Sequence, residues 1–281
     1  MIERIPVYFT PLMLADAESF SPSAGKPADV MASWQRLSVP LQVREPAPVR
    51  HAELCRAHDP GYVHDVLAGV ELNGFGNRSA EVARSLPYTS GAMLAAAREA
   101  ITNAAVAVAP CSGFHHAHYE SAHGYCTFNG LVVAAQALRD AGFAQRVGIL
   151  DFDQHYGDGT DDILQHLGLA YIEHYTAGHH WHSPRQAKDF LAQIPAIVRG
   201  LRACDVILYQ AGADPHVDDP LGGWLTTEQL HQRDLAVFRA AQALRIPVAW
   251  NLAGGYQTPL RKVLDIHDNT MRACGEVYLA A

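Results

Sequence analysis

Short apolar runs alternate along this chain with longer segments of helical periodicity. Short runs bounded by polar or turn residues are typical of buried strands, and we predict strands over residues 6–10, 106–110, 147–152, 170–173, 206–210 and 248–252. Helices are predicted between them, over residues 60–69, 91–105, 129–141, 185–202, 227–244 and 259–278. This alternation predicts an α/β fold of three layers, with a mainly parallel β-sheet flanked by helices.

Two segments carry residues that favour the start of a helix. Residues 158–160 (Asp-Gly-Thr) are expected to cap a helix that begins soon after the strand over 147–152. Residues 226–229 (Thr-Thr-Glu-Gln) offer comparable chemistry for the helix over 227–244. In both cases, a side-chain oxygen would accept from the free backbone N–H groups of the first turn.

Polar side chains follow four of the predicted strands. Alternate side chains of an extended backbone share a face, so Asp151, Asp153 and His155 can converge where the apolar run 147–150 ends. The segments 113–116, 211–214 and 254–256 also stand just after strands. Because pockets of open parallel sheets lie at this end of the strands, the pattern predicts a metal site there. Residues 151–155 alone would equally fit ordinary caps and hydrogen-bond partners.

Composition narrows the class of protein. A chain of 281 residues without a linker is expected to form a single domain over 1–281. With 49% hydrophobic and 18% charged residues, it has ample material for a core. We expect a cytoplasmic protein with no membrane partner, because it lacks a span of ~20 apolar residues and a signal-peptide pattern.

Charge and cysteine usage exclude further classes. The formal charge of −8, without a Lys/Arg cluster, argues against a nucleic-acid partner. The five cysteines form no CxxC pair and are odd in number, so they are expected to be reduced thiols. Neither a disulfide framework nor a zinc ribbon is predicted.

In chain order, these segments resemble the histone deacetylase superfamily, which includes acetylpolyamine amidohydrolases and bacterial deacetylase-like proteins. The matching text lies at residues 58–63, 113–117, 124–129, 151–160, 211–214, 219–222 and 252–256. The joint pattern is far more specific than each piece, and the chain is similar to a short, bacterial-type member. The resemblance implies an arginase-like α/β fold and one divalent metal that supports hydrolysis of an N-acyl amide.

By position, Asp153, His155 and Asp214 match the metal ligands of that family. Two carboxylates and one neutral imidazole suit Zn²⁺ and leave positions open for water and a substrate carbonyl. Fe²⁺ is the alternative metal. Two anionic ligands offset the charge of the ion, so a separate base is expected.

The resemblance also assigns catalytic roles to two adjacent histidines. His116 matches the general base that takes a proton from water and returns it to the leaving amine, and His115 would tune the charge beside it. Asp151 and Asp158 match the carboxylates that orient His115 and His116 respectively. Such carboxylates hold the tautomer and the direction of an imidazole ring.

Tyr256 matches the active-site tyrosine of the family, whose phenol donates to the oxygen that becomes negative during the reaction. Gly124 and Tyr125 resemble positions that line the narrow acyl tunnel, and Leu221 stands where the family has another apolar wall residue. Apolar packing in the core is the alternative for Tyr125 and Leu221.

Two loops depart from the family pattern. Residues 13–22 lack the usual histidine- and proline-rich text, so the entrance on that side is not assigned. Residues 171–182 lack the usual glycine/proline-rich loop after a strand with a short hydroxyl residue, which weakens the case for a structural K⁺ site near Asp151. We expect the histidines of this loop to form a wet rim rather than a second metal site: His174, His179, His180 and His182.

The leading hypothesis is removal of an acetyl or other short acyl group from a lysine side chain or from a small amine or polyamine. A ureohydrolase with two metal ions is a second hypothesis, which His216 disfavours because such enzymes carry further aspartates. A module that binds a metal or an acyl ligand without turnover is the third. A neighbouring subunit could complete the pocket, so a homo-oligomer stays open.

Overall fold

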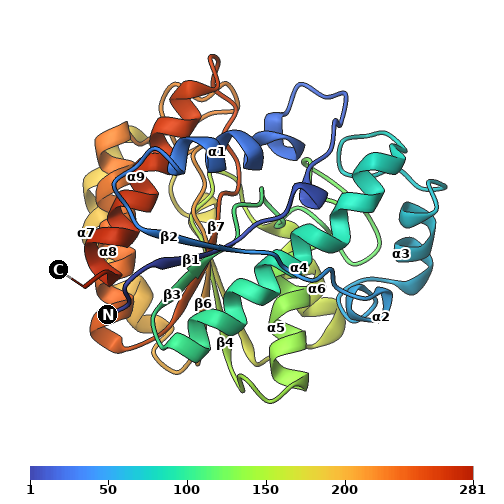
Figure 1. Ribbon diagram of the computed structural model, residues 1–281, viewed down its shortest axis with the longest axis horizontal. Coiled ribbons are helices and arrows are strands. Elements are labelled where there is room, and N and C mark those ends of the chain that lie inside the picture. The colour runs from blue at the N-terminus through green and yellow to red at the C-terminus, as the bar shows by residue number, and fades with distance from the viewer. Residues whose placement is uncertain (281) are drawn as a thin grey trace.

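The computed structural model describes residues 1–280 and shows a parallel β-sheet covered by helices on both faces (Figure 1). Within those residues, the sheet has seven strands in the order β2-β1-β3-β7-β6-β4-β5. Neighbouring strands pair in parallel. The strands are β1 (Ile5–Tyr8), β2 (Leu41–Arg44), β3 (Val106–Val108), β4 (Val147–Asp151), β5 (Ile172–Thr176), β6 (Val206–Gln210) and β7 (Val248–Asn251).

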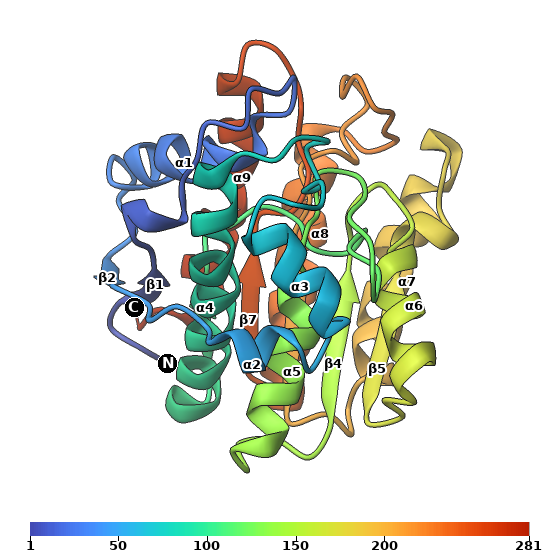
Figure 2. The ribbon, with the colours of Figure 1, turned by 90° about the vertical axis from the view of Figure 1, so that its right-hand side faces the viewer.

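Two layers of helices enclose this sheet, and Figure 2 shows the second layer in front of it. The first layer contributes to one core and contains α1 (Lys26–Trp34), α7 (Ala187–Gly200), α8 (Thr227–Leu244) and α9 (Arg261–Tyr278). The second contributes to the other core and contains α2 (His51–Leu54), α3 (Pro60–Leu67), α4 (Ala80–Asn103), α5 (Gly130–Asp140) and α6 (Asp158–Leu167). The sequence prediction of a three-layer, mainly parallel α/β fold is therefore confirmed.

Both faces of the central strands are buried, which explains why their sequences read as continuous apolar runs. In β4, Val147 and Ile149 belong to the core under α3–α6, whereas Leu150 and the following Phe152 belong to the core under α1 and α7–α9. Adjacent side chains of a strand point to opposite faces. A strand between two helical layers therefore needs apolar residues at both its odd and its even positions.

Some elements differ from the sequence predictions. Strand β2 was not predicted, because it is an edge strand whose middle residues, Gln42 and Val43, are exposed and so form no buried run. Strand β5 begins and ends later than predicted, at Ile172–Thr176. Helix α4 begins well before residue 91, and Pro87 lies inside it. Helix α1 was also missed.

The two helix starts have different outcomes. Thr226 forms a capping box with Gln229: its hydroxyl accepts from the Gln229 N–H, and Gln229 Oε1 accepts from the Thr226 N–H. The prediction that residues 158–160 supply a side-chain bond at the start of α6 is confirmed in part. Gly157 takes the N-cap position and Asp158 is the first helical residue, and Oδ1 of Asp158 accepts from the Gly159 N–H at 3.0 Å.

The register of the strands brings the polar segments together. Asp151 at the end of β4 pairs with Gln210 of β6, and Gln210 pairs with Asn251 of β7. The loops that follow these strands therefore begin side by side, and the loop after β3 starts next to β7, where Val108 pairs with Trp250. The polar segments that the sequence analysis identified after the strands therefore lie at one edge of the sheet.

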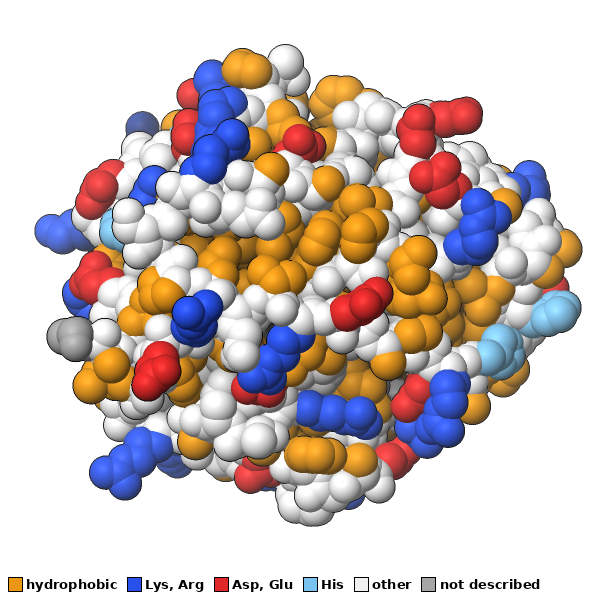
Figure 3. Space-filling model, viewed as in Figure 1, with side chains coloured by type: hydrophobic (Ala, Val, Ile, Leu, Met, Phe, Trp, Pro, Cys, Tyr) orange, Lys and Arg blue, Asp and Glu red, His pale blue; other side chains and the backbone are white. Residues whose placement is uncertain are grey.

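The surface in Figure 3 has positive and negative side chains interspersed around apolar patches. Ile2, near the N-terminus, forms a parallel bridge with Leu279. None of the helices within residues 1–280 is both long and apolar enough to span a bilayer.

Candidate active site

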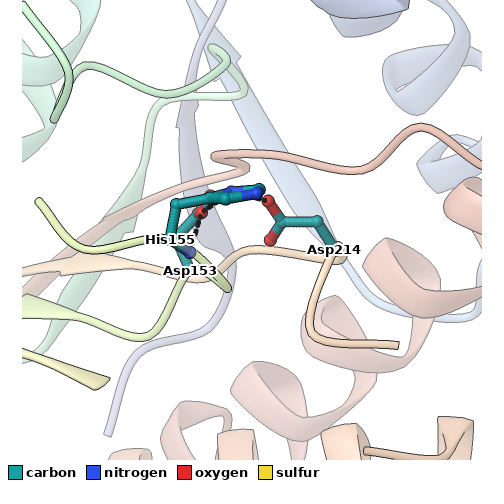
Figure 4. A group of neighbouring side chains, drawn as sticks. All are labelled: Asp153, His155 and Asp214. Atoms are coloured by element: carbon teal, nitrogen blue, oxygen red, sulfur yellow. Dashed lines mark hydrogen bonds and ion pairs between the residues drawn. The ribbon is translucent and has the colours of Figure 1, made fainter. Parts of the chain in front are cut away.

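Three side chains with metal-ligand chemistry converge at the carboxyl edge of the sheet (Figure 4). Asp153 and His155 follow β4, and Asp214 follows β6. One ligand atom from each lies within 4.8 Å of the others. Nδ1 of His155 is 3.2 Å from both Oδ1 of Asp153 and Oδ2 of Asp214, so the imidazole lies between the two carboxylates. The structure therefore brings together the residues that the sequence suggested as ligands.

Backbone N–H groups hold both carboxylates in place. The Gly254 N–H donates to Oδ2 of Asp153 at 2.9 Å, and the Gln154 N–H donates to Oδ1 of Asp214 at 3.1 Å. Oδ2 of Asp214 is buried, and beyond the 3.2 Å contact with Nδ1 of His155 it has no hydrogen-bond partner among the described residues. Burial, followed by repulsion from Asp153, raises the pKa of Asp214 to about 7. A buried carboxylate oxygen with a free lone pair, beside a second carboxylate, fits a cation.

The electrostatics of His155 support the same interpretation. Burial opposes a charge on its ring, but hydrogen bonds and charge attraction from Asp153 and Asp214 outweigh burial and raise the pKa of His155 to about 11. The two carboxylates thus favour a positive charge between them. Two oxygen ligands and one nitrogen ligand suit a divalent ion such as Zn²⁺ or Fe²⁺.

His115 is buried beside this group. Its Nδ1 donates to Oδ2 of Asp151 at 2.7 Å, and its Nε2 is 3.5 Å from Oδ1 of Asp153. Burial lowers the tendency of the ring to charge, yet Asp151 and Asp153 outweigh it and raise the pKa of His115 to about 9. The carboxylates beside His115 therefore favour its charged form.

His116 has a different environment although it is the next residue. Its Nδ1 donates to Oδ1 of Asp158 at 2.6 Å, and its side chain is 19% exposed, which leaves it open toward the solvent side. Burial and the neighbouring charge of His115 lower its pKa, against the opposing effect of Asp158. Its partner Asp158 lies in the first turn of α6, where the same Oδ1 also accepts from the Gly159 N–H at 3.0 Å.

Gln210 holds the segment that carries His115 and His116 in place, and the sequence analysis missed Gln210. Its Oε1 accepts from the Phe114 N–H at 3.1 Å, and its Nε2 donates to Oδ1 of Asp151 at 3.0 Å. The residue is fully buried. Its position at the end of an apolar strand, directly before the segment 211–214, was an available signal, since a polar residue that ends a buried strand needs partners.

Tyr256 enters the site from the loop after β7. Its backbone N–H donates to Oδ2 of Asp219 at 2.8 Å, and Gly255 before it has φ +142°, a conformation that favours glycine. The side chain is 8% exposed. Burial, together with the charges of Asp214 and Asp153, raises its pKa well above the ordinary value, so the phenol keeps its proton.

A small hollow lies beside these groups, with a cavity volume of ≈ 10 Å³, about the space that one water molecule needs. Its walls are formed by Ser23, Gly113, His115, Gly124, Tyr125, Cys126, Asp153, Gly254 and Tyr256. Gly124 lies against the ring of His116, since a Cβ there would be 2.4 Å from Cδ2 of that ring. The ring of Tyr125 is 5.6 Å from that of Tyr256. In the described part of the chain, Leu221 is outside this lining and 40% exposed, so the structure does not bring it to the hollow.

The histidine-rich loop is only partly the wet rim that we expected. His179, His180 and His182 are exposed. The expectation is wrong for His174, whose side chain is 3% exposed and donates from Nδ1 to Oδ1 of Asp161 at 2.7 Å. This partner comes from α6, so the loop sequence alone could not indicate it.

The end of β5 also corrects the reading of that loop. Because β5 extends to Thr176, it does end in a short hydroxyl residue, and Thr176 pairs with Asp151 across the sheet. The Thr176 hydroxyl accepts from the Gly157 N–H at 3.1 Å. The departure from the family pattern is therefore smaller than the sequence suggested, and the K⁺ site near Asp151 stays a prediction.

Comparisons with known proteins agree with this geometry. Residues 26–175 match the histone deacetylase domain family. An uncharacterized protein of Picosynechococcus sp. is 28% identical over 262 residues, which cover 85% of this chain and 87% of that protein. Acetylpolyamine amidohydrolase 2 of Pseudomonas aeruginosa is 54% identical over 50 residues, but these cover 18% of this chain and 14% of that enzyme.

Two solved structures share the fold. The HD domain of HDA15 superposes with a TM-score of 0.78 and 19% identity, over 98% of this chain and 88% of that one. The acetylpolyamine aminohydrolase of Burkholderia pseudomallei superposes with a TM-score of 0.76 and 20% identity, over 97% of this chain and 99% of that one.

The sheet, the helical layers and the family match define a deacetylase-type α/β protein. The chain belongs to the histone deacetylase superfamily. This family points to a deacetylase or amidohydrolase, a class of enzymes that hydrolyse amides.

Proposed function

We propose that this protein is a metal-dependent amidohydrolase that removes an acetyl or other short acyl group from a lysine side chain or from a small amine or polyamine. The observation that carries the proposal is the gathering of three kinds of group at the carboxyl edge of the sheet. These are a ligand set (Asp153, His155 and Asp214), two histidines with separate carboxylates, and a protonated phenol. One member of each group lines the hollow: Asp153, His115 and Tyr256.

The ligand set would hold one divalent ion. When bound, such an ion polarises the amide carbonyl and makes water a better nucleophile. Asp153 and Asp214 bring two negative charges, so together with neutral His155 they would largely neutralise the ion. Proton transfer then falls to other residues of the chain.

His116 is suited to transfer that proton. Its lowered pKa keeps the ring neutral near pH 7, and its bond to Asp158 places the ring proton on Nδ1. Nε2 therefore has a free lone pair that can accept a proton from water and return it to the leaving amine. Burial lowers the pKa of His116 most, and the charge of His115, which Asp151 favours, lowers it further.

Tyr256 is suited to stabilise the negative oxygen that develops on the carbonyl. A buried phenol that keeps its proton donates a hydrogen bond throughout the reaction, and a fixed donor in a hollow shielded from water stabilises the transition state more than the ground state. The bond from the Tyr256 N–H to Asp219 fixes the backbone at this residue.

The substrate class rests on two further observations. Relatives named acetylpolyamine amidohydrolases support an acylated amine as substrate. The formal charge of −8 would attract cationic amines over long range. Both observations fit an acylated polyamine, and the charge also fits the flanks of an acylated lysine.

The test is acyl release by purified protein loaded with Zn²⁺ or Fe²⁺. A panel of N-acyl-lysine peptides and N-acyl-polyamines is used, with chelator-treated protein as the blank. We expect release of acyl group from at least one substrate class, and the ratio of turnover on acetyl-lysine peptides to that on acetylputrescine separates the two classes. No release from the whole panel would contradict the proposal, and acyl binding without release would indicate the non-catalytic module. Two metal ions per chain would favour a ureohydrolase-like centre.

A further inference from the structure

Arg233 is a fully buried cation directly behind the proposed metal ligands, with 0% of its surface exposed. It lies in α8 on the buried face, together with Leu230 and Val237. Its Nε donates to Oδ1 of the adjacent Asp234 at 2.8 Å, so the pair carries no net charge. Burial of an ion pair is costly in free energy unless hydrogen bonds offset it. Nη1 of Arg233 bonds to the site, whereas Nη2 has no partner among the described residues.

One nitrogen of Arg233 connects the two loops that carry the carboxylates. Nη1 donates to the carbonyl of Phe152 at 3.1 Å and to the carbonyl of Gly212 at 2.7 Å. Phe152 directly precedes Asp153, and Gly212 comes two residues before Asp214. The guanidinium therefore spans the backbones from which both proposed carboxylate ligands project.

The two loops are in close contact at this point. A Cβ on Gly212 would be 2.7 Å from Oδ1 of Asp214 and 2.8 Å from Cα of Asp153, so no side chain fits between them. The two carboxylates carry like charges in a buried place and repel each other. A link between the backbones, with a positive charge beneath them, opposes their separation.

The guanidinium is itself held in one orientation. Asp234 accepts from the Tyr209 hydroxyl through Oδ1 and from the Thr270 hydroxyl through Oδ2. These residues come from β6 and α9, so the carboxylate that holds Arg233 is fixed to both the sheet and a neighbouring helix. A lysine ammonium lacks the planar fork that can reach Asp234 and the two carbonyls together.

We propose that Arg233 is a positioning residue that sets the separation of Asp153 and Asp214, and through it the affinity and coordination geometry of the metal site. This inference rests on the proposed function in one respect, that these aspartates bind a metal. Arg233 touches neither substrate nor metal in this role; it acts through two backbone carbonyls.

The test compares Arg233→Lys with Arg239→Lys, a matched control on the same helix. Arg239 is exposed and pairs with Glu276 on the surface. Metal-free protein is titrated with Zn²⁺ against a chromophoric chelator, and the absorption spectrum of the Co²⁺-loaded protein reports the ligand geometry. We expect R233K to bind Zn²⁺ about 10- to 100-fold more weakly, with an altered Co²⁺ spectrum. R239K should match the wild type in both measurements.

The outcomes separate this inference from the proposed function. If the wild type binds no metal, the proposed function fails first. If the wild type binds Zn²⁺ and folded R233K binds it equally well with an unchanged Co²⁺ spectrum, the role of Arg233 is refuted. If R233K does not fold, the same measurements are made on Asp234→Asn. This variant keeps Arg233 and nearly the side-chain volume at position 234, but it weakens the group that orients the guanidinium. Unchanged Zn²⁺ affinity in D234N would refute the inference as well.

Discussion

Nδ1 of His116 donates to Oδ1 of Asp158 at 2.6 Å, and this bond gives two consecutive histidines different partners. His115 uses Asp151, which is fully buried at the end of β4, whereas Asp158 lies in the first turn of α6 and its side chain is 44% exposed. The more exposed pair can exchange protons with water and substrate. The buried pair is suited to hold a fixed charge.

Asp158→Asn tests this division of roles. An amide can present its NH₂ group to Nδ1 and thereby favour the tautomer with the proton on Nε2, which cannot accept another. We expect kcat to fall about 10- to 100-fold with little change in metal content. The control is Asp161→Asn on the same helix, where the carboxylate binds His174 away from the hollow. Equal kcat in D158N and D161N would contradict the assigned role of His116.

Tyr256→Phe removes the phenol that we assign to the oxyanion. Loss of one such donor is expected to lower kcat by about 10²–10³-fold, with metal content and folding unchanged. Tyr8→Phe is the control, since Tyr8 lies on β1 and its hydroxyl donates to Glu99 outside the site. Steady-state kinetics on one substrate measure both variants, and a Y256F enzyme with wild-type kcat would exclude the phenol from catalysis.

Gly254→Ala is expected to disrupt metal binding by steric conflict. A Cβ at Gly254 would be 2.1 Å from Oδ2 of Asp214 and 2.9 Å from Oδ2 of Asp153. The conflict must displace a carboxylate or the N–H that holds Asp153, so we expect metal affinity to fall about tenfold or more. The control is Gly200→Ala at the end of α7, where a Cβ would meet nothing within 4 Å among the described residues. Both variants are titrated with metal. Equal affinities would show that metal binding does not need the close packing at Gly254.

Lys26 predicts a pH dependence of stability. Its ammonium is buried at the start of α1, where Nζ donates to the Ala253 carbonyl at 2.7 Å, and burial lowers its pKa from 10.5 to about 8 against the attraction of Asp214. Between these values the unfolded chain binds more protons than the folded one. The free energy of unfolding contributed by this group therefore rises with pH, by up to ~1.4 kcal/mol per pH unit.

Urea unfolding of the wild type and Lys26→Met from pH 7.5 to 9.5 measures this effect, because other titrating groups largely cancel in the difference. We expect the wild type to gain stability relative to K26M as the pH rises. Lys188→Met, at an exposed position of α7, should show no such trend. Parallel stability curves for the wild type and K26M would show that Lys26 has its ordinary pKa in the folded state.

The sequence alone was enough to predict the central sheet and the place of the site. Strands β4, β6 and β7 are buried on both faces, so each must be an apolar run, and such runs are visible without a structure. Parallel strands place their carboxyl ends at one edge, so the polar residues that follow them, Asp153 and Asp214 among them, were expected to meet.

Only the tertiary structure decided which partner each of these residues has. Local sequence favoured a solvent-facing His174, but packing of the loop against α6 gives this ring a bond to Asp161. Arg233 and Phe152 bond to each other although they are 81 residues apart in the sequence. Strand β2 is an exposed edge strand without a buried apolar run, so its sequence did not predict it. Short-range periodicity follows from the burial of each element, whereas hydrogen-bond partners depend on how the elements pack, and packing joins residues that the sequence keeps far apart.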